Sequence, residues 1–478
     1  MTGPNSPARP GPASYVTAKP LVWALAIVLP FALFFYLFHL GVARDTAIFI
    51  AIVSLTLLSW MFSLTADFIP GLFALLLLLL FGLVPNRVAL SGFSSNGFLI
   101  AFSVMGLGAV ISTSGLARRY TLWLIQILPQ NSLAYQMAVF FTGFLLNPVV
   151  PTITARAVMV CPIMNRMSDH MDEKTRNRTA TQMYLAGLDG INLLSPVFLT
   201  AAPANLMVFG LFPVQEQFTF QFTYWCFAAS IAGAIILGAY FLVSALFFKG
   251  WHRIEMDQAD IKAQWQEMPA MSGAEWAALA SIILLTLGIV TAPWHKIPIP
   301  LIAFSIICFL LVFGALDRKA FIEKIDWPFL FLLAAMIGVM ASMNHMGLDK
   351  ALVARFDTFK TFMRMDFEKF VLVLSSITLL VRLFIPLNSA ILILAAAFLP
   401  LASGAGISPW AVGFIILIMS ETAFFGFQSP YILFFRSQVA GHVPYSEPRV
   451  QLFHGILVLV KLGAIYASIP FWRSIGVL

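Results

Sequence analysis

The stretch LNPVVPTITAR, residues 146–156, interrupts a long apolar run with two prolines, an asparagine, two threonines and an arginine. Inside a lipid bilayer, irregular chain persists only where protein surrounds it or where it lines a wet cavity, because unpaired backbone groups are costly there. A second interruption, FIPLNS at residues 384–389, lies in the other half of the chain. Paired interruptions of this kind are typical of the substrate site of a transporter.

The composition is that of a polytopic membrane protein. The chain is 60% hydrophobic and 10% charged, with a mean hydropathy of +0.91, which lies far from the composition of a soluble domain. The net charge is +7, but the basic residues stand in short segments between apolar runs, which indicates topology signals rather than a nucleic-acid-binding face. Cys161, Cys226 and Cys308 have no paired spacing, so we expect small packed core residues.

The apolar runs predict an all-α fold with about eleven transmembrane helices, since some 17 to 25 apolar residues suffice to span a bilayer. Residues 1–20 are expected to form a disordered cytoplasmic tail. The paired segments 132–167 and 368–403 are each expected to form a re-entrant hairpin. The predicted spans are 21–41, 46–64, 67–84, 97–117, 179–212, 222–248, 275–292, 298–316, 327–347, 407–436 and 451–470.

The basic residues predict the orientation of these spans. They gather in the connections on one side, apart from a cluster at 350–369, which puts the N-terminus in the cytoplasm and the C-terminus outside. Counting each paired segment as two crossings gives the same sides, so charge does not decide re-entrancy. The proline and asparagine in the turns favour hairpins. The segment 350–369 itself resembles an amphipathic surface helix.

An internal repeat divides the chain into two halves. GFLIAFSVMG (97–106) resembles FLFLLAAMIG (329–338), and each unit precedes a paired segment and then a span that is broken near its far end, at APAN (202–205) and QSPY (428–431). The first unit starts outside and the second inside, so the repeats are inverted. The predicted organisation is a first repeat at 21–248, a cytoplasmic linker at 249–274 and a second repeat at 275–478.

With these elements in place, the chain resembles the divalent anion sodium symporter family over about residues 20–478. The resemblance is strongest in TSGLARR (113–119), in the hairpin exits and in the terminal IPFWRSIG (469–476). It implies a carrier of dicarboxylates, citrate or sulfate in a bacterial-type inner membrane. It also implies a homodimer of the elevator type, in which early spans form a scaffold while hairpins and broken spans form a moving transport domain.

The motifs of that family are altered here. Its hairpin tips carry Ser-Asn-Thr, whereas the corresponding slots read TIT (152–154) and AIL (390–392), with Asn388-Ser389 a few residues early. Its broken spans carry a motif of a small residue, Thr, two Pro and Asn, which survives as PAN (203–205) and as SP (429–430). The fold and the general class therefore follow from the resemblance, whereas sodium coupling and a dicarboxylate substrate do not.

The candidate binding residues are the polar and charged side chains at these interruptions. A sodium site needs several oxygens, and Thr152, Thr154 and Asn205 can supply some of them. The alternative is that the hydroxyls bond their own helix. The full candidate set for substrate or ion binding is Asn147, Thr152, Thr154, Arg156, Asp189, Asn205, Arg382, Asn388, Ser389, Glu421 and Ser429.

Four ionisable residues stand inside predicted spans: Arg156, Asp189, Arg382 and Glu421. Each needs a partner or a wet cavity, because a charge at the bilayer centre costs at least about 2.5 to 3.5 kcal/mol. Our hypothesis is that Arg156 supplies fixed positive charge where the resembled family places sodium, or grips the anion through its planar fork. The alternative is a salt bridge from Arg156 to Asp189 or Glu421 that only holds helices together.

The coupling ion is left open between Na⁺ and H⁺. Asp189 in GLDGIN and Glu421 in SET can bind and release a proton when buried, or can merely compensate the arginines. His39, His345 and His454 have no ligand spacing and are expected to be packed or interfacial.

The expected function is secondary active transport of a small anion by alternating access. No grouping of His, Cys or Asp indicates an enzyme or a bound cofactor. The alternatives are a sodium-independent anion exchanger, a proton-coupled permease or exporter, and an anion channel.

Overall fold

The computed structural model describes residues 20–62, 64–116, 119–120, 123, 131–169, 171–248, 265–348, 351, 357–422 and 429–478. Within these ranges the regular structure is helical and no β-strand is present. The predicted tail, except for its last residue, lies outside the described residues, as do residues 249–264 of the predicted linker and parts of the predicted amphipathic segment. The chain forms two compact units, and each takes residues from both halves of the sequence.

The first unit comprises residues 1–95 and 327–355. Its helices are α1 (Pro20–His39), α2 (Arg44–Met61), α3 (Phe68–Leu80), α4 (Asn86–Ala89), the 3₁₀ helix η2 (Ser91–Ser94) and α18 (Trp327–His345). Helix α18 packs against α3 and η2, and Leu75, Leu78 and Ala335 lie in the shared core. Most apolar side chains of α1 are exposed, as expected for a helix that faces lipid.

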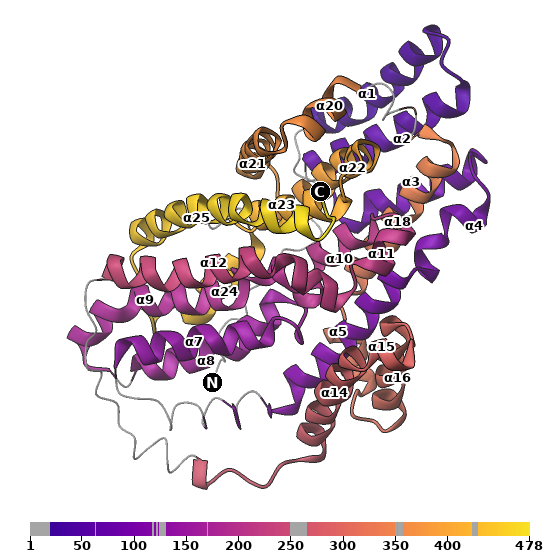
Figure 1. The fold of residues 1–478 in the computed structure, drawn as a ribbon. Coiled ribbons are helices and arrows are strands. Elements are labelled where there is room, and N and C mark those ends of the chain that lie inside the picture. Colours follow the sequence, from indigo (N-terminus) through magenta and orange to yellow (C-terminus); the bar gives the residue numbers. More distant parts are fainter. Residues whose placement is uncertain are drawn as a thin grey trace. The chain divides into compact units, whose positions relative to one another are not determined.

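The second unit comprises residues 96–326 and 356–478. Figure 1 shows α12 and α25 side by side, although they are far apart in the sequence. Its helices are α5 (Asn96–Ser114), α7 (Ser132–Leu146), α8 (Ile153–Asp169), α9 (Glu173–Asn192), η3 (Ser195–Val197), η4 (Leu199–Ala201), α10 (Pro203–Gly210), α11 (Val214–Thr219), α12 (Phe222–Phe248), α14 (Gly273–Val290), α15 (Ala292–His295), α16 (Ile299–Val312), α17 (Arg318–Lys324), α20 (Asp357–Met365), α21 (Phe367–Phe384), α22 (Leu387–Ala405), α23 (Pro409–Ser420), α24 (Pro430–Val439) and α25 (Glu447–Ser474).

Both predicted paired segments are pairs of helices. Helices α7 and α8 are separated at residues 147–152, and α21 and α22 at Ile385-Pro386. Both predicted broken spans are also interrupted. The first break begins at Leu193, earlier than the expected APAN, and passes through η3 and η4 before α10 starts at Pro203. Pro196 explains the earlier start, because its ring removes a backbone donor and clashes with the preceding helical turn.

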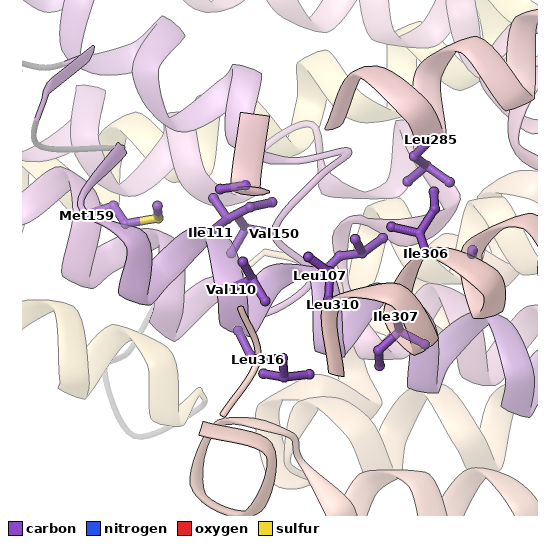
Figure 2. Packing of buried hydrophobic residues seen from close by; sticks show 13 residues of the cluster. Leu107, Val110, Ile111, Val150, Met159, Leu285, Ile306, Ile307, Leu310 and Leu316 are labelled. Carbon is purple, nitrogen blue, oxygen red and sulfur yellow. The ribbon is translucent and has the colours of Figure 1, made fainter. Parts of the chain in front are cut away.

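A hydrophobic cluster joins the first hairpin tip to the rest of the second unit. Figure 2 shows its residues on α5, α14 and α16, with Val150 from the tip and Met159 from α8 among them. Val150 is fully buried, so apolar packing fixes the position of the irregular stretch between α7 and α8.

Eight helices of the described ranges are long and apolar enough to cross a membrane, and the protein is a multi-pass integral membrane protein. The expectation that all three cysteines are packed is wrong for Cys308. Cys161 is buried and Cys226 is half-buried, but Cys308 is exposed. It lies on α16 near other exposed apolar side chains such as Phe309 and Val312, because a lipid-facing surface tolerates apolar exposure.

Candidate functional site

Asn147 ties the first hairpin tip to helix α9. It follows the last residue of α7 and is fully buried. Its Nδ2 donates to the carbonyl oxygens of Gly143 at 3.3 Å, Phe144 at 3.2 Å and Gly190 at 3.1 Å. Its Oδ1 accepts from Ser195 Oγ at 3.0 Å and from Arg156 Nη1. One amide therefore satisfies carbonyls on two helices and holds a guanidinium.

Arg156 on α8 is fully buried and binds neutral groups. Besides Asn147, its Nη2 donates to Ser195 Oγ at 3.2 Å. Among the described residues no carboxylate forms an ion pair with Arg156, so the predicted alternative of a salt bridge to Asp189 or Glu421 is wrong. The reason is geometric: the tip and the α9 break already surround the guanidinium with oxygens. Its Nε has no hydrogen-bond partner in the described part of the chain.

Asn205 and Thr200 stabilise the break between α9 and α10. Asn205 Nδ2 donates to the carbonyl oxygens of Ser195 and Phe198, both at 2.8 Å. Thr200 Oγ1 donates to the carbonyl oxygen of Pro148 at 2.7 Å, which links η4 to the hairpin tip. Carbonyls that a continuous helix would pair internally are thus satisfied by side chains.

Arg382 stabilises the second tip and the second break through hydrogen bonds. It lies near the end of α21 and is buried. Its Nη1 donates to the carbonyl oxygen of Ile385 at 2.8 Å, and its Nε to that of Ser420 at 3.0 Å. Its Nη2 donates to Ser429 Oγ at 3.1 Å. A single guanidinium therefore connects the second hairpin tip to both ends of the α23–α24 break.

Two buried acids lie beside these breaks. Glu421 Oε2 accepts from Tyr431 OH at 3.3 Å, and the same hydroxyl accepts from Asn192 Nδ2 at 2.8 Å. Asp189 Oδ1 lies 3.0 Å from His454 Nε2 on α25. His454 is packed, as expected, with a side chain that is 12% exposed. Its partner Asp189 comes from a tertiary contact with α9, which the neighbouring sequence does not reveal.

The hydroxyl-bearing candidates are distributed unevenly. Ser429 takes part in the Arg382 network, and Ser389 is buried. Thr152 and Asn388 are half-buried, whereas Thr154 is exposed. The structure thus brings Asn147, Arg156 and Asn205 together, but it places Thr154 at the surface.

Sequence reasoning missed Ser195, Tyr431 and Lys461. Lys461 is buried on α25, and its Nζ donates to Thr422 Oγ1 at 3.1 Å. A lysine within the apolar run LVLVKLGAI is the same signal that identified the other ionisable residues, so it could have been found. Ser195 and Tyr431 carry no such signal, because their roles depend on how the breaks fold.

Two interrupted helices, each hydrogen-bonded to a helix pair through a buried arginine, are the kind of arrangement that secondary transporters use. The sequence model of the family described as "Sodium:sulfate symporter transmembrane region" matches residues 17–433. This chain belongs to that family, which is part of the divalent anion sodium symporter group.

Curated relatives agree with this assignment. Inner membrane protein YbhI of Escherichia coli (strain K12) is 24% identical over 272 residues, 55% of this chain and 56% of that protein. The L-tartrate/succinate antiporter of the same strain is 25% identical over 272 residues, 54% of each chain. The matches therefore span about half the length of these curated relatives.

Two solved transporters share the fold. The Alcanivorax borkumensis YdaH transporter has a TM-score of 0.53 at 16% identity, covering 81% of this chain and 88% of its own. Neisseria gonorrhoeae MtrF, whose structure is described as illuminating a class of antimetabolite efflux pumps, has a TM-score of 0.54 at 15% identity, covering 84% of each chain.

Proposed function

We propose that this protein is a secondary transporter that exchanges small divalent anions across the inner membrane without sodium. The observation that carries the proposal is the position of Arg382. Sodium in such folds is coordinated by unwound backbone carbonyls at helix breaks and by nearby side-chain oxygens. Here the carbonyls of Ile385 and Ser420 and the hydroxyl of Ser429 are bound by a guanidinium, which supplies fixed positive charge.

The first half supports the same interpretation. Arg156 binds the oxygens of Asn147 and Ser195 at the α8 tip and the α9 break. Arg156 is fully buried, and its printed partners are neutral oxygens. A buried cation without a carboxylate partner costs several kcal/mol in the membrane, so Arg156 suits a site whose ligand is an anion. The free Nε of Arg156 adds a donor for such a ligand.

The substrate class follows from the surroundings and from relatives. Helices α8 and α10 begin at the first tip and the first break, and α22 and α24 begin at their counterparts. Helix N-termini favour anions. One family member is named for exchange of two dicarboxylates, and the family description names sulfate. We therefore assign a dicarboxylate, or a similar doubly charged oxyanion, as the substrate.

Orientation and assembly belong to the same proposal. The basic connections favour a cytoplasmic N-terminus and an external C-terminus. Family membership supports a homodimer in which hairpins and interrupted helices move against the early spans.

The test is counterflow in proteoliposomes. Vesicles preloaded with succinate, tartrate or sulfate should take up the labelled anion at the same rate in sodium and in potassium buffer. Arg382→Gln should lower the rate at least about tenfold, equivalent to about 1.4 kcal/mol, because backbone carbonyls at the break lose their partner. The control is Arg318→Gln on α17, whose side chain is exposed. Uptake that needs sodium would overturn the proposal.

A further inference from the structure

Four ionisable side chains meet at the face of α25 that packs on α9. They are Asp189 of α9, Glu421 at the end of α23, and His454 and Lys461 of α25. Together with Asn192, Thr422 and Tyr431 they line a cavity of about 20 Å³, which is room for about one water molecule. We call these four ionisable residues the α25 cluster.

We propose that the α25 cluster is a proton-binding site that couples proton movement to anion exchange. His454 and Asp189 receive the proton, and Glu421 with Tyr431 extends the hydrogen-bonded path to the second break. The inference rests on the proposed anion exchange only for its transport readout, because proton binding can be measured without substrate.

The charges favour uptake of one proton. Counted with both acids ionised, Lys461 protonated and His454 neutral, the cluster carries one net negative charge. A proton on His454 makes it neutral and turns the 3.0 Å contact with Asp189 into an ion pair. Histidine is also the side chain that ordinarily changes charge between about pH 5 and 8.

Two carboxylate oxygens can accept a further hydrogen bond. Asp189 Oδ2 and Glu421 Oε1 are buried and have no partner among the described residues, while both side chains line the cavity. A buried carboxylate oxygen without a donor is costly, and a proton or a water removes that cost. Loading the site is therefore favourable on grounds of hydrogen bonding as well as charge.

The surrounding elements contribute further charged and titratable groups. Tyr240 of α12 interacts electrostatically with Asp189. Arg156 of α8 and Arg382 of α21 interact with Glu421, and Lys461 interacts with both acids. The field at the arginines thus depends on whether the α25 cluster holds a proton.

The backbone provides the mechanical link to the hairpin tips. Asn147 donates to the carbonyl of Gly190, which is the residue after Asp189. Arg382 donates to the carbonyl of Ser420, which is the residue before Glu421. Each tip is thus hydrogen-bonded to the residue beside one acid of the cluster, so movement of a tip displaces that acid.

Other ligands fit the cluster less well. A cavity of about 20 Å³ is too small for a dicarboxylate. Within the described ranges, no group of three His, Cys, Asp or Glu side chains is arranged to hold a metal ion. A proton matches both the size of the cavity and its unpaired carboxylate oxygens.

The experiment measures counterflow at several pH values, equal on both sides, and proton flux with a trapped pH dye under an imposed gradient. Wild-type exchange should change with a limiting slope of about tenfold per pH unit, as linkage to one proton requires. His454→Gln should bring the ratio of rates at pH values of about 5.5 and 7.5 close to one. The matched control is His442→Gln, which removes a half-buried histidine 2.8 Å from Asp169 and should keep the wild-type ratio.

The outcomes separate this inference from the proposed function. Counterflow that does not depend on pH and moves no protons would overturn the proton site while sustaining anion exchange. If no anion exchanges at all, infrared difference spectra of the purified protein between about pH 5 and 8 decide the question. A protonation signal that Asp189→Asn and His454→Gln remove supports the site, and spectra that these variants leave unchanged overturn it.

Discussion

At the scale of single residues, Asn147 is the most connected side chain of the first tip. The substitution Asn147→Ala removes the acceptor of Arg156 Nη1 and the donor to the Gly190 carbonyl, both in buried surroundings. Each unsatisfied group costs about 1 to 3 kcal/mol. We expect the melting temperature in detergent to fall by several degrees, whereas Asn388→Ala, at a half-buried position, should change it little. Equal melting temperatures for the two variants would contradict the network.

The residues that sequence reasoning identified share one property: each places a charge where burial in the membrane costs free energy. Arg156, Arg382, Asp189 and Glu421 stand in apolar runs where charge is costly, so a single sequence reveals them. Their partners are mostly backbone carbonyls, such as those of Ile385 and Ser420. Every residue has a backbone carbonyl, so the sequence does not show which carbonyls act as acceptors until the break is folded. For the same reason, the sequence suggested a carboxylate as the partner of Arg156, whereas the structure pairs it with neutral oxygens.

At the scale of elements, close contact between α7 and α9 positions the first tip. A Cβ on Gly190 would lie 2.5 Å from the carbonyl oxygen of Phe140. Gly190→Ala must push the helices apart, and we expect a loss of about 1 to 3 kcal/mol in the free energy of unfolding with weaker anion binding. Gly463→Ala on α25 is the control, since no atom lies within 4 Å there. Unfolding experiments that show the same stability for both variants would refute this account.

The interruptions themselves were predictable because proline and asparagine in an apolar run conflict with a continuous helix. Both paired segments are pairs of helices, and both predicted broken spans are interrupted. The start of the first break was misplaced, because Pro196 acts before Pro203. The presence of a break thus follows from the prolines and polar residues in the sequence. The residue at which the helix ends depends on which of these prolines the tertiary structure places at the end of the helix.

At the scale of the whole molecule, sequence repeats and compact units divide the chain differently. Helices α5 and α18 are related by the repeat, yet α5 belongs to the second unit and α18 to the first. Repeats record similar local sequence, whereas compact units record which faces pack together. The sequence alone predicts the former, because packing partners require the folded arrangement.

The proposed mechanism predicts how the whole molecule responds to voltage. When the same anion exchanges at equal pH on both sides, charges and protons carried inward equal those carried outward, so no net charge moves. A potassium diffusion potential set with valinomycin should therefore leave the rate of succinate self-exchange unchanged. A channel would respond, because each elementary charge gains about 2.3 kcal/mol per 100 mV. Tracer uptake that follows the imposed potential would show that the anion moves uncoupled, and alternating access would have to be abandoned for this protein.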